Sequence, residues 1–318
     1  MRHGTSSLGK LALGVAAILL GRVELAQAIC FGDPTRFISY SGPENISVPR
    51  DVPDGTLLYS ETKTLPRSSF ECTSQELWGL DLASGRGPSP TSKTIDFPIG
   101  VSGLSFRIKV GLGSGMGYVA SLDPLKWGAY YLRDEMILEI YKRGALAPSG
   151  VVRAGDLGVV KFGSKNIVDI ALGLNINVVA LSCESPDVNV AMGDDYTLVD
   201  FGDPGSTARA VPFNITLNNC PSGITKVNYQ LQALTPVVDA AQGVVGLNAT
   251  STAVGIGLQI KDANGQPVPL NTPRTFTGYD TGGGNFLIPF TASYYRMAME
   301  SLRPGSANTE ITFIMSYL

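Results

Sequence analysis

Histidine is almost absent from this sequence of 318 residues, which has a single one, His3. That residue lies in a stretch with the three parts of a secretory signal. These parts are a basic start, an apolar core and a small-residue cleavage site, in residues 2–10, 11–20 and 26–28. Residues 1–28 are therefore predicted to be removed, and the mature chain from Ile29 would contain no histidine. This excludes Ser-His-Asp and Cys-His nucleophile pairs and metal sites that use histidine.

Long apolar runs and clusters of basic residues are also missing. The apolar core of the signal is shorter than the roughly 20 residues that a membrane-spanning helix needs. Lipid attachment at Cys30 is an alternative, but Ile29 stands where a small residue is required. Without the signal the chain has 21 basic and 26 acidic residues, a net charge of −5. This mild acidic excess argues against a nucleic-acid partner.

Cysteine is scarce, with four in all. In an exported chain four cysteines indicate two disulfides, for which three pairings are possible. We predict Cys30–Cys72 and Cys183–Cys220, because this pairing places one bridge in each half of the chain. Each would close a loop of about 40 residues and stabilise the fold by roughly 3–4 kcal/mol in the chain-entropy model. No thiolate would then remain as a metal ligand, and no cofactor is expected.

Helical patterns are rare, and short alternating runs between turn residues indicate an all-β chain with 37 Gly and 20 Pro. Only residues 136–142 could pass for a helix, and their β-branched and aromatic neighbours favour a strand at least as much. The mature length of 290 residues suggests two domains. The boundary is predicted near residues 173–177, inside a nearly continuous apolar run, which gives domains at 29–173 and 174–318.

The C-terminal half has three features in a fixed order. They are a segment closed by the second cysteine of its pair (211–220), a run that alternates glycine with apolar residues (254–260), and a final strand with tyrosine in the penultimate position (311–318). Together they resemble the pilin domain of chaperone–usher pili. The resemblance implies an immunoglobulin-like β-sandwich that lacks its last strand, and therefore a hydrophobic groove beside an unpaired edge.

The resemblance also implies what fills this groove. A periplasmic pilus chaperone would occupy it first, and a strand from the adjacent fimbrial subunit would then replace the chaperone during assembly at an outer-membrane usher. Alternate residues of the final strand form a fully apolar face. The residues expected to line the groove are Ile311, Phe313, Met315 and Tyr317.

The N-terminal half has an early cysteine, a glycine-rich strand (100–109) and a strand that ends at Gly144, all ahead of the pilin-like half. This arrangement resembles the receptor-binding domain of two-domain pilus tip adhesins, including the type 1 and type 3 fimbrial families. Only Ile29 would precede Cys30 in the mature chain, so no donor extension is expected. The resemblance then implies secretion through the periplasm to the tip of a fibre on the cell surface.

A receptor site would need carboxylates or amides together with an exposed aromatic ring. Residues 123–134 combine these groups after a turn signal, which predicts an exposed loop. The predicted receptor-binding residues are Asp123, Trp127, Tyr130 and Arg133. A second candidate is Trp78 with Glu76 and Asp81. The structural alternative is that Trp127 and one of Tyr130 or Tyr131 belong to the core of a sandwich.

Other motifs give weaker signals. The glycine-rich stretch 111–117 fits neither the dinucleotide nor the phosphate-loop pattern, so we predict a turn between strands. Asp194 and Asp195 could bind calcium, but a solvated turn fits them better. A pair of carboxylates could act as in a glycosidase, although the sequence does not show which two would pair.

The sequence thus predicts a fimbrial tip adhesin without enzymatic activity. It would attach a bacterium to a glycan or matrix-protein receptor on a host or another surface, and it would be assembled by donor-strand complementation. Two alternatives stay open. One is a two-domain structural subunit that caps or initiates the fibre without binding a ligand, and the other is an exported enzyme with a pilin-like anchor.

Overall fold

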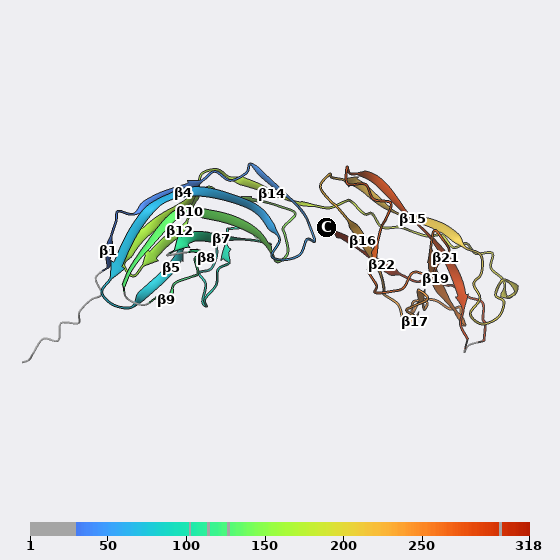
Figure 1. Cartoon of the computed structure of the whole chain (residues 1–318). Helices are drawn as coiled ribbons and strands as arrows, with labels where there is room; N and C mark the ends of the chain where they lie inside the picture. The colour runs from blue at the N-terminus through green and yellow to red at the C-terminus, as the bar shows by residue number, and fades with distance from the viewer. Residues whose placement is uncertain (1–29, 102, 113–114, 126–127, 299–300) are drawn as a thin grey trace, which may run out of the picture.

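The structure is a computed structural model that describes residues 30–101, 103–112, 115–125, 128–298 and 301–318. The predicted signal lies outside this part of the chain. Figure 1 shows two lobes that meet beyond the end of β14 (Ile176–Leu181), with the C-terminus at the junction. In the described residues the regular elements are strands and one 3-10 helix, η1 (Leu198–Asp200), which confirms the all-β prediction. In this part of the chain no helix is long and apolar enough to cross a membrane.

The N-terminal domain is built from three sheets. The first contains β1 (Cys30–Gly32), β4 (Leu57–Cys72), β10 (Gly128–Arg143), β7 (Gly103–Leu112) and β6 (Phe97–Pro98) in that order, with β8 (Gly115–Tyr118) also paired to β7. The second contains β2 (Arg36–Tyr40), β13 (Lys165–Leu172), β12 (Gly155–Phe162), β5 (Glu76–Leu82) and β9 (Asp123–Leu125). The third contains β11 (Ser149–Val152), β14 and β3 (Asn45–Pro49). The glycine-rich stretch 111–117 spans the end of β7 and the start of β8, and the antiparallel pairing of these two strands is what a turn between them requires.

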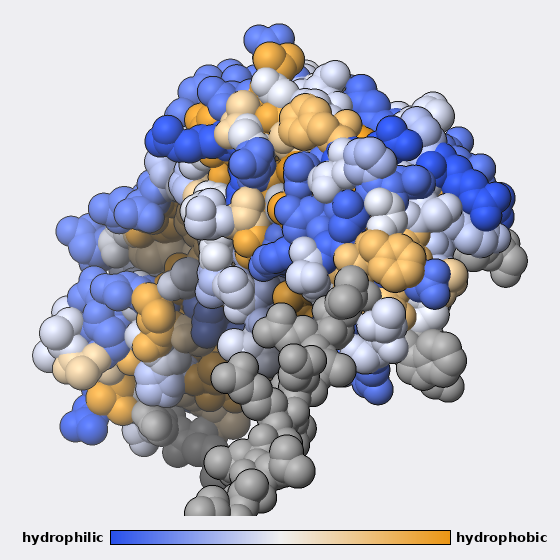
Figure 2. Space-filling view, turned by 90° about the vertical axis from the view of Figure 1, so that its left-hand side faces the viewer, coloured by the Kyte–Doolittle hydropathy of each residue, from blue (hydrophilic) through white to orange (hydrophobic). Residues whose placement is uncertain are grey.

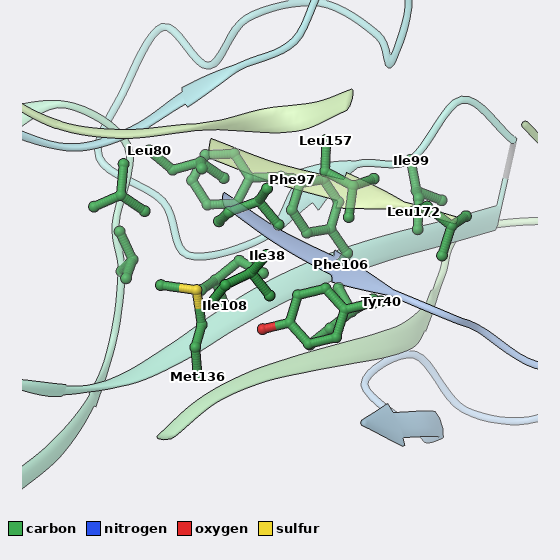
Figure 3. Packing of buried hydrophobic residues seen from close by; sticks show 14 of the residues in the cluster. Ile38, Tyr40, Leu80, Phe97, Ile99, Phe106, Ile108, Met136, Leu157 and Leu172 are labelled. Carbon is green, nitrogen blue, oxygen red and sulfur yellow. The ribbon is translucent and has the colours of Figure 1, made fainter. Parts of the chain in front are cut away.

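Strand β10 shows how the sequence builds this core. Met136, Leu138 and Ile140 have no exposed surface, whereas the residues between them point to the other face of the sheet. Burying one such side chain contributes about 1.5–3 kcal/mol. Figure 3 shows Met136 among residues of both large sheets, including Phe106 and Tyr40. The segment that was ambiguous between helix and strand is therefore a strand, because both of its edges are paired, with β4 and with β7.

The C-terminal domain has two sheets around a core of its own. One contains β15 (Val211–Cys220), β21 (Gly284–Arg296), β19 (Ile256–Asp262), β18 (Val244–Val245) and β17 (Val237–Asp239). The other contains β20 (Arg274–Thr275), β16 (Val227–Ala233) and β22 (Ile311–Tyr317). Strand β22 lies at the edge of this smaller sheet, with β16 as its neighbour.

The two cores divide within one apolar run. Ile176 and Val178 of β14 pack in the N-terminal core, whereas Leu181 and Cys183 pack in the C-terminal core. This division falls a few residues after the predicted join near 173–177. The run is almost continuously apolar because it serves both cores in succession. Each domain contains one disulfide, Cys30–Cys72 or Cys183–Cys220, in the predicted pairing.

Candidate functional site

A long groove of about 1100 Å³ runs along β22 in the C-terminal domain. One wall consists of the four residues predicted to line it, Ile311, Phe313, Met315 and Tyr317. Its apolar lining also includes Leu231 of the neighbouring β16 and residues of the other sheet, namely Phe213, Ile215, Leu258, Ile260, Ala292 and Tyr294. Met315 and Tyr317 are buried, whereas Ile311 and Phe313 are only half-buried. Apolar side chains therefore remain accessible along one half of β22.

The backbone of β22 is open toward the groove. Leu318 exchanges amide and carbonyl hydrogen bonds with Lys226, on the side of β16. Residues along a strand alternate in the side to which their backbone groups point. The N–H and C=O groups of Ile311, Phe313, Met315 and Tyr317 therefore point away from β16, into the groove.

The opposite wall is a second unpaired stretch of backbone, residues 186–191. Val188, Val190 and Met192 line the groove from this side. Within the described chain, residues 186–191 form no backbone–backbone hydrogen bond. The groove is thus bounded by the open edge of β22 and by a segment without backbone pairing, a geometry that a further strand could fill.

The far end of the N-terminal domain gathers aromatic residues from the two sequence candidates. The ring of Phe70 stacks on Trp78 at 5.6 Å and on Tyr130 at 6.1 Å between ring centroids. Phe162 packs edge-on against Phe70, Trp78 and Tyr130. Trp78 and Tyr130 are half-buried, so each contributes to the core and also reaches the surface. Figure 2, which views the molecule from this end, shows apolar side chains scattered among polar ones.

Asp123 lies next to this aromatic cluster. It is the register partner of Trp78 between β9 and β5, and it forms an ion pair with Lys93 at 2.6 Å. Asp123 and Lys93 line a hollow of about 210 Å³, together with Asp81 and Ser121. The hollow therefore offers two carboxylates, an ammonium and a hydroxyl within a small volume, which suits recognition of a polar ligand.

The other predicted receptor residues are more dispersed. Arg133 lies further along β10, opposite Gly111 of β7, and forms an ion pair with Asp134. Glu76 lies opposite Leu125, at the start of β5. Asp81 forms an ion pair with Lys161 at 2.8 Å. Trp127 lies outside the described residues. The structure thus brings Asp123, Trp78 and Tyr130 together and places Arg133 elsewhere on the strand.

A polar network on β7, β8 and β10 has no counterpart in the sequence predictions. The hydroxyls of Tyr118 and Tyr141 both donate to Glu139 Oε2, at 2.9 and 2.7 Å. Arg107 lies 4.0 Å from the centre of the Tyr141 ring and donates to Asp96 at 2.7 Å. Burial, and then the hydrogen bonds to Tyr118 and Glu139, raise the pKa of Tyr141. Alternation along β10 places Glu139 and Tyr141 on one face of that strand. It does not reveal their partners on other strands, Tyr118 and Arg107.

The aspartates considered for calcium binding have surroundings that give little support to that role. Asp195 forms an ion pair with Arg209 and is exposed, in a turn before η1. Within the described part of the chain, no group of three or more histidine, cysteine, aspartate or glutamate residues could hold a metal ion. The groove and the aromatic end with its hollow are therefore the two candidate binding regions.

Comparison with known proteins identifies the family of this chain. The model of the family "Fimbrial protein" matches residues 170–318. The type-1 fimbrial protein A chain of Escherichia coli strain K12 is 32% identical over 142 residues, which are 43% of this chain and 75% of that protein. Fimbrial subunit type 1 of Salmonella typhimurium is 31% identical over 143 residues, with the same two coverages. The chain belongs to the fimbrial protein family.

Two solved structures are also similar. The CupB6 tip adhesin from Pseudomonas aeruginosa has a TM-score of 0.37 and 16% identity, over 90% of this chain and 93% of that one. The receptor-binding domain of the adhesin MrkD1P of Klebsiella pneumoniae has a TM-score of 0.39 and 16% identity, over 49% of this chain and 98% of that one. The family assignment rests on the sequence matches. It confirms the resemblance to pilus proteins and makes this chain an exported pilus subunit with a structural or binding role.

Proposed function

We propose that this fimbrial subunit is the tip adhesin of a chaperone–usher pilus, which attaches a bacterium to a glycan or matrix-protein receptor. The observation that carries the proposal is an open strand edge in one domain, preceded by a second sandwich with its own core. Strand β1 of that sandwich is paired with β4 and is tied to it by the Cys30–Cys72 disulfide. Residues 30–32 therefore serve their own domain and are not available to complete a neighbouring subunit.

The groove is the proposed site of strand acceptance. A strand inserted between β22 and residues 186–191 would pair with both open backbones, and its alternate apolar side chains would cover the half-buried Phe313 and Ile311. A periplasmic chaperone would supply the first such strand. The adjacent subunit would supply the final one at the outer-membrane usher. Apart from a few residues at the junction, the groove lies in the C-terminal domain. Strand acceptance therefore leaves the far end of the N-terminal domain free.

The aromatic end and its hollow are the proposed receptor site. The Asp123 carboxylate and the Lys93 ammonium could hydrogen-bond sugar hydroxyls or polar groups of a matrix protein, while the exposed parts of Trp78 and Tyr130 provide an apolar surface. Trp127 and Arg133 follow on the same stretch of chain and are proposed to contribute. Weak binding at one tip would be multiplied by many fibres on each cell.

The test uses the full mature chain, produced in the periplasm with its chaperone and applied to an array of glycans and matrix proteins. We expect specific retention on one class of spot. Asp123→Ala should weaken that retention about tenfold or more, because it removes a charged hydrogen-bonding group. Asp54→Ala is the matched control, since Asp54 is also an ion-paired aspartate and pairs with Lys142 near the domain junction, away from the proposed receptor site.

Two outcomes would separate the parts of this proposal. A folded chain that binds no spot would favour the structural subunit that caps or initiates the fibre. Phe313→Asp places a charge in the groove and should abolish capture by the chaperone while receptor binding through the N-terminal domain persists. Normal capture of that variant would count against the groove as the site of strand acceptance.

A further inference from the structure

Strand β22 is not open along its whole length, because two residues of the N-terminal domain bind its C-terminal end. Arg50 and Asp51 directly follow β3. The Asp51 amide donates to the Tyr317 carbonyl oxygen at 2.9 Å, and the Tyr317 amide donates to Asp51 Oδ2 at 2.9 Å. The Arg50 guanidinium donates to the Met315 carbonyl oxygen at 2.7 Å and lies 5.0 Å from the centre of the Tyr317 ring. We call Arg50 and Asp51 the edge cap.

The edge cap occupies backbone groups that an added strand would need. Both backbone groups of Tyr317 and the carbonyl of Met315 point into the groove, and the edge cap binds all of them. With one acceptor on its side chain and one donor on its backbone, Asp51 takes the place of a residue opposite Tyr317 in a ladder. Among the described residues, the Met315 amide and both backbone groups of Phe313 and Ile311 have no such partner.

The N-terminal domain holds the edge cap in position. Pro49, the last residue of β3, is the register partner of Leu181 in β14, and the Arg50 amide donates to the Leu181 carbonyl at 3.0 Å. Arg50 and Asp51 also form an ion pair with each other at 3.1 Å. The Tyr317 side chain is fixed on its far side, where its hydroxyl contacts Ser185 Oγ at 3.2 Å. Both partners of the contact are therefore tied to regular structure, and the cap lies at a defined point of β22.

We propose that the edge cap sets the end point of the strand that β22 accepts. The incoming strand would pair with residues 311–315 and stop where Arg50, which lines the same groove, begins. The proposal rests on the strand acceptance proposed above. It assigns a role in selecting the partner to the N-terminal domain, because a strand that extends past Met315 gains no further hydrogen bonds from β22 while the cap is in place.

The experiment compares peptides of two lengths on the full mature chain, refolded with its disulfides intact. All peptides alternate valine with threonine and carry a fluorescent label. The short peptide is as long as the stretch 311–315 that it would pair with. Two longer peptides each carry a further pair of residues, one at its N-terminal end and the other at its C-terminal end, which covers both strand directions. Fluorescence anisotropy gives the rate of dissociation of each.

On the native chain we expect the long peptides to dissociate within about twofold of the short one. On R50A/D51A, one long peptide should dissociate at least about fivefold more slowly, because the freed groups of Tyr317 and Met315 can pair with it. Asp51→Asn keeps an acceptor for the Tyr317 amide and should retain the native behaviour. Asp54→Ala, three residues further along, should also be without effect.

The two proposals fail in different ways. If a long peptide already dissociates several-fold more slowly on the native chain and R50A/D51A changes nothing, the edge cap does not set the end point, whereas strand acceptance stands. If none of the peptides binds the native chain, strand acceptance itself fails, and the edge-cap proposal fails with it. Unchanged tryptophan fluorescence of R50A/D51A would show that the N-terminal domain stays folded.

Discussion

Strands β10 and β22 have the same alternating pattern but different surroundings. In the N-terminal domain β10 lies between β4 and β7, and its apolar residues Met136, Leu138 and Ile140 are fully buried. In the C-terminal domain β22 has β16 on one side and the groove on the other, and its apolar face is buried only toward Tyr317. An alternating sequence therefore specifies a strand and a face, while the neighbouring strands determine how much of that face is removed from water.

The comparison also shows two ways of treating a strand edge. The N-terminal domain covers the edges of β10 with its own long strands, whereas the C-terminal domain leaves most of one edge open, which in an isolated protein favours aggregation. The edge cap covers only the last part of that edge. The C-terminal domain should therefore depend on a partner for its stability, and the N-terminal domain should not.

The largest expected effect comes from supplying a second neighbour for β22. An alternating valine and threonine strand, joined by a flexible linker after Leu318, should raise the unfolding free energy of the C-terminal domain by several kcal/mol, since each buried valine contributes about 1.5 kcal/mol or more. The N-terminal domain should not change. Both tryptophans, Trp78 and Trp127, lie in the N-terminal half, so their fluorescence reports that domain alone. Hydrogen exchange measured by mass spectrometry would follow the other, and equal gains in both domains would contradict the comparison.

Removing one disulfide at a time should separate the two domains next. Each bridge closes a similar loop, with sequence separations of 42 and 37 residues, so each removal should cost roughly 3–4 kcal/mol. C183S/C220S should unfold the C-terminal domain in the absence of a partner. C30S/C72S should leave the N-terminal domain folded with a lower melting temperature. Urea unfolding of both variants, followed with the two probes above, tests this, and the reverse ranking would contradict it.

The smallest expected effect concerns acid sensitivity of the N-terminal domain. Burial alone would raise the pKa of Glu61, but hydrogen bonds from Lys63, from the Gly42 and Ser41 amides and from Tyr59 lower it from 4.5 to about 2. The stabilisation is therefore complete above about pH 4.5 and is lost as the pH falls toward 2. Allowing for partial exposure, Glu61→Gln should cost about 1–2 kcal/mol at pH 7.

The matched control for this variant is Glu135→Gln, on an exposed position of β10. The difference between Glu61→Gln and the native chain should shrink between pH 4.5 and 2, as measured by unfolding monitored through tryptophan fluorescence. A difference that stays constant over this range would mean that the Glu61 carboxylate does not carry the charge-dependent part of the stability.

Patterns within single segments were the part of this fold that the sequence could predict. The alternation in residues 311–317 and the placement of one cysteine pair in each half led to a strand and disulfides that the structure contains, and residues 136–142, left open between helix and strand, form the strand that their β-branched and aromatic neighbours favoured. The parallel pairings of β2 with β13 and of β3 with β14 could not be predicted, because an alternating strand does not specify its neighbour.

The candidate sites show the same limit. Residues 123–134 were chosen because carboxylate, cationic and aromatic groups lie close in sequence, and Asp123 and Tyr130 do lie near one aromatic cluster. Lys93 was not found, because it lies in a loop 30 residues from its partner Asp123. The contact of Asp51 with Tyr317 joins residues 266 positions apart, and no local pattern indicates it.

The direct passage from β14 into the C-terminal domain has a mechanical consequence. A tensile load on the C-terminal domain reaches the N-terminal domain through β14, along the axis of that strand. The hydrogen bonds of β14 to its parallel neighbour β3 and its antiparallel neighbour β11 then carry the load together, in shear, and do not open one after another as in a zipper. The connection between the domains is therefore built to transmit a pull between them without an elastic tether.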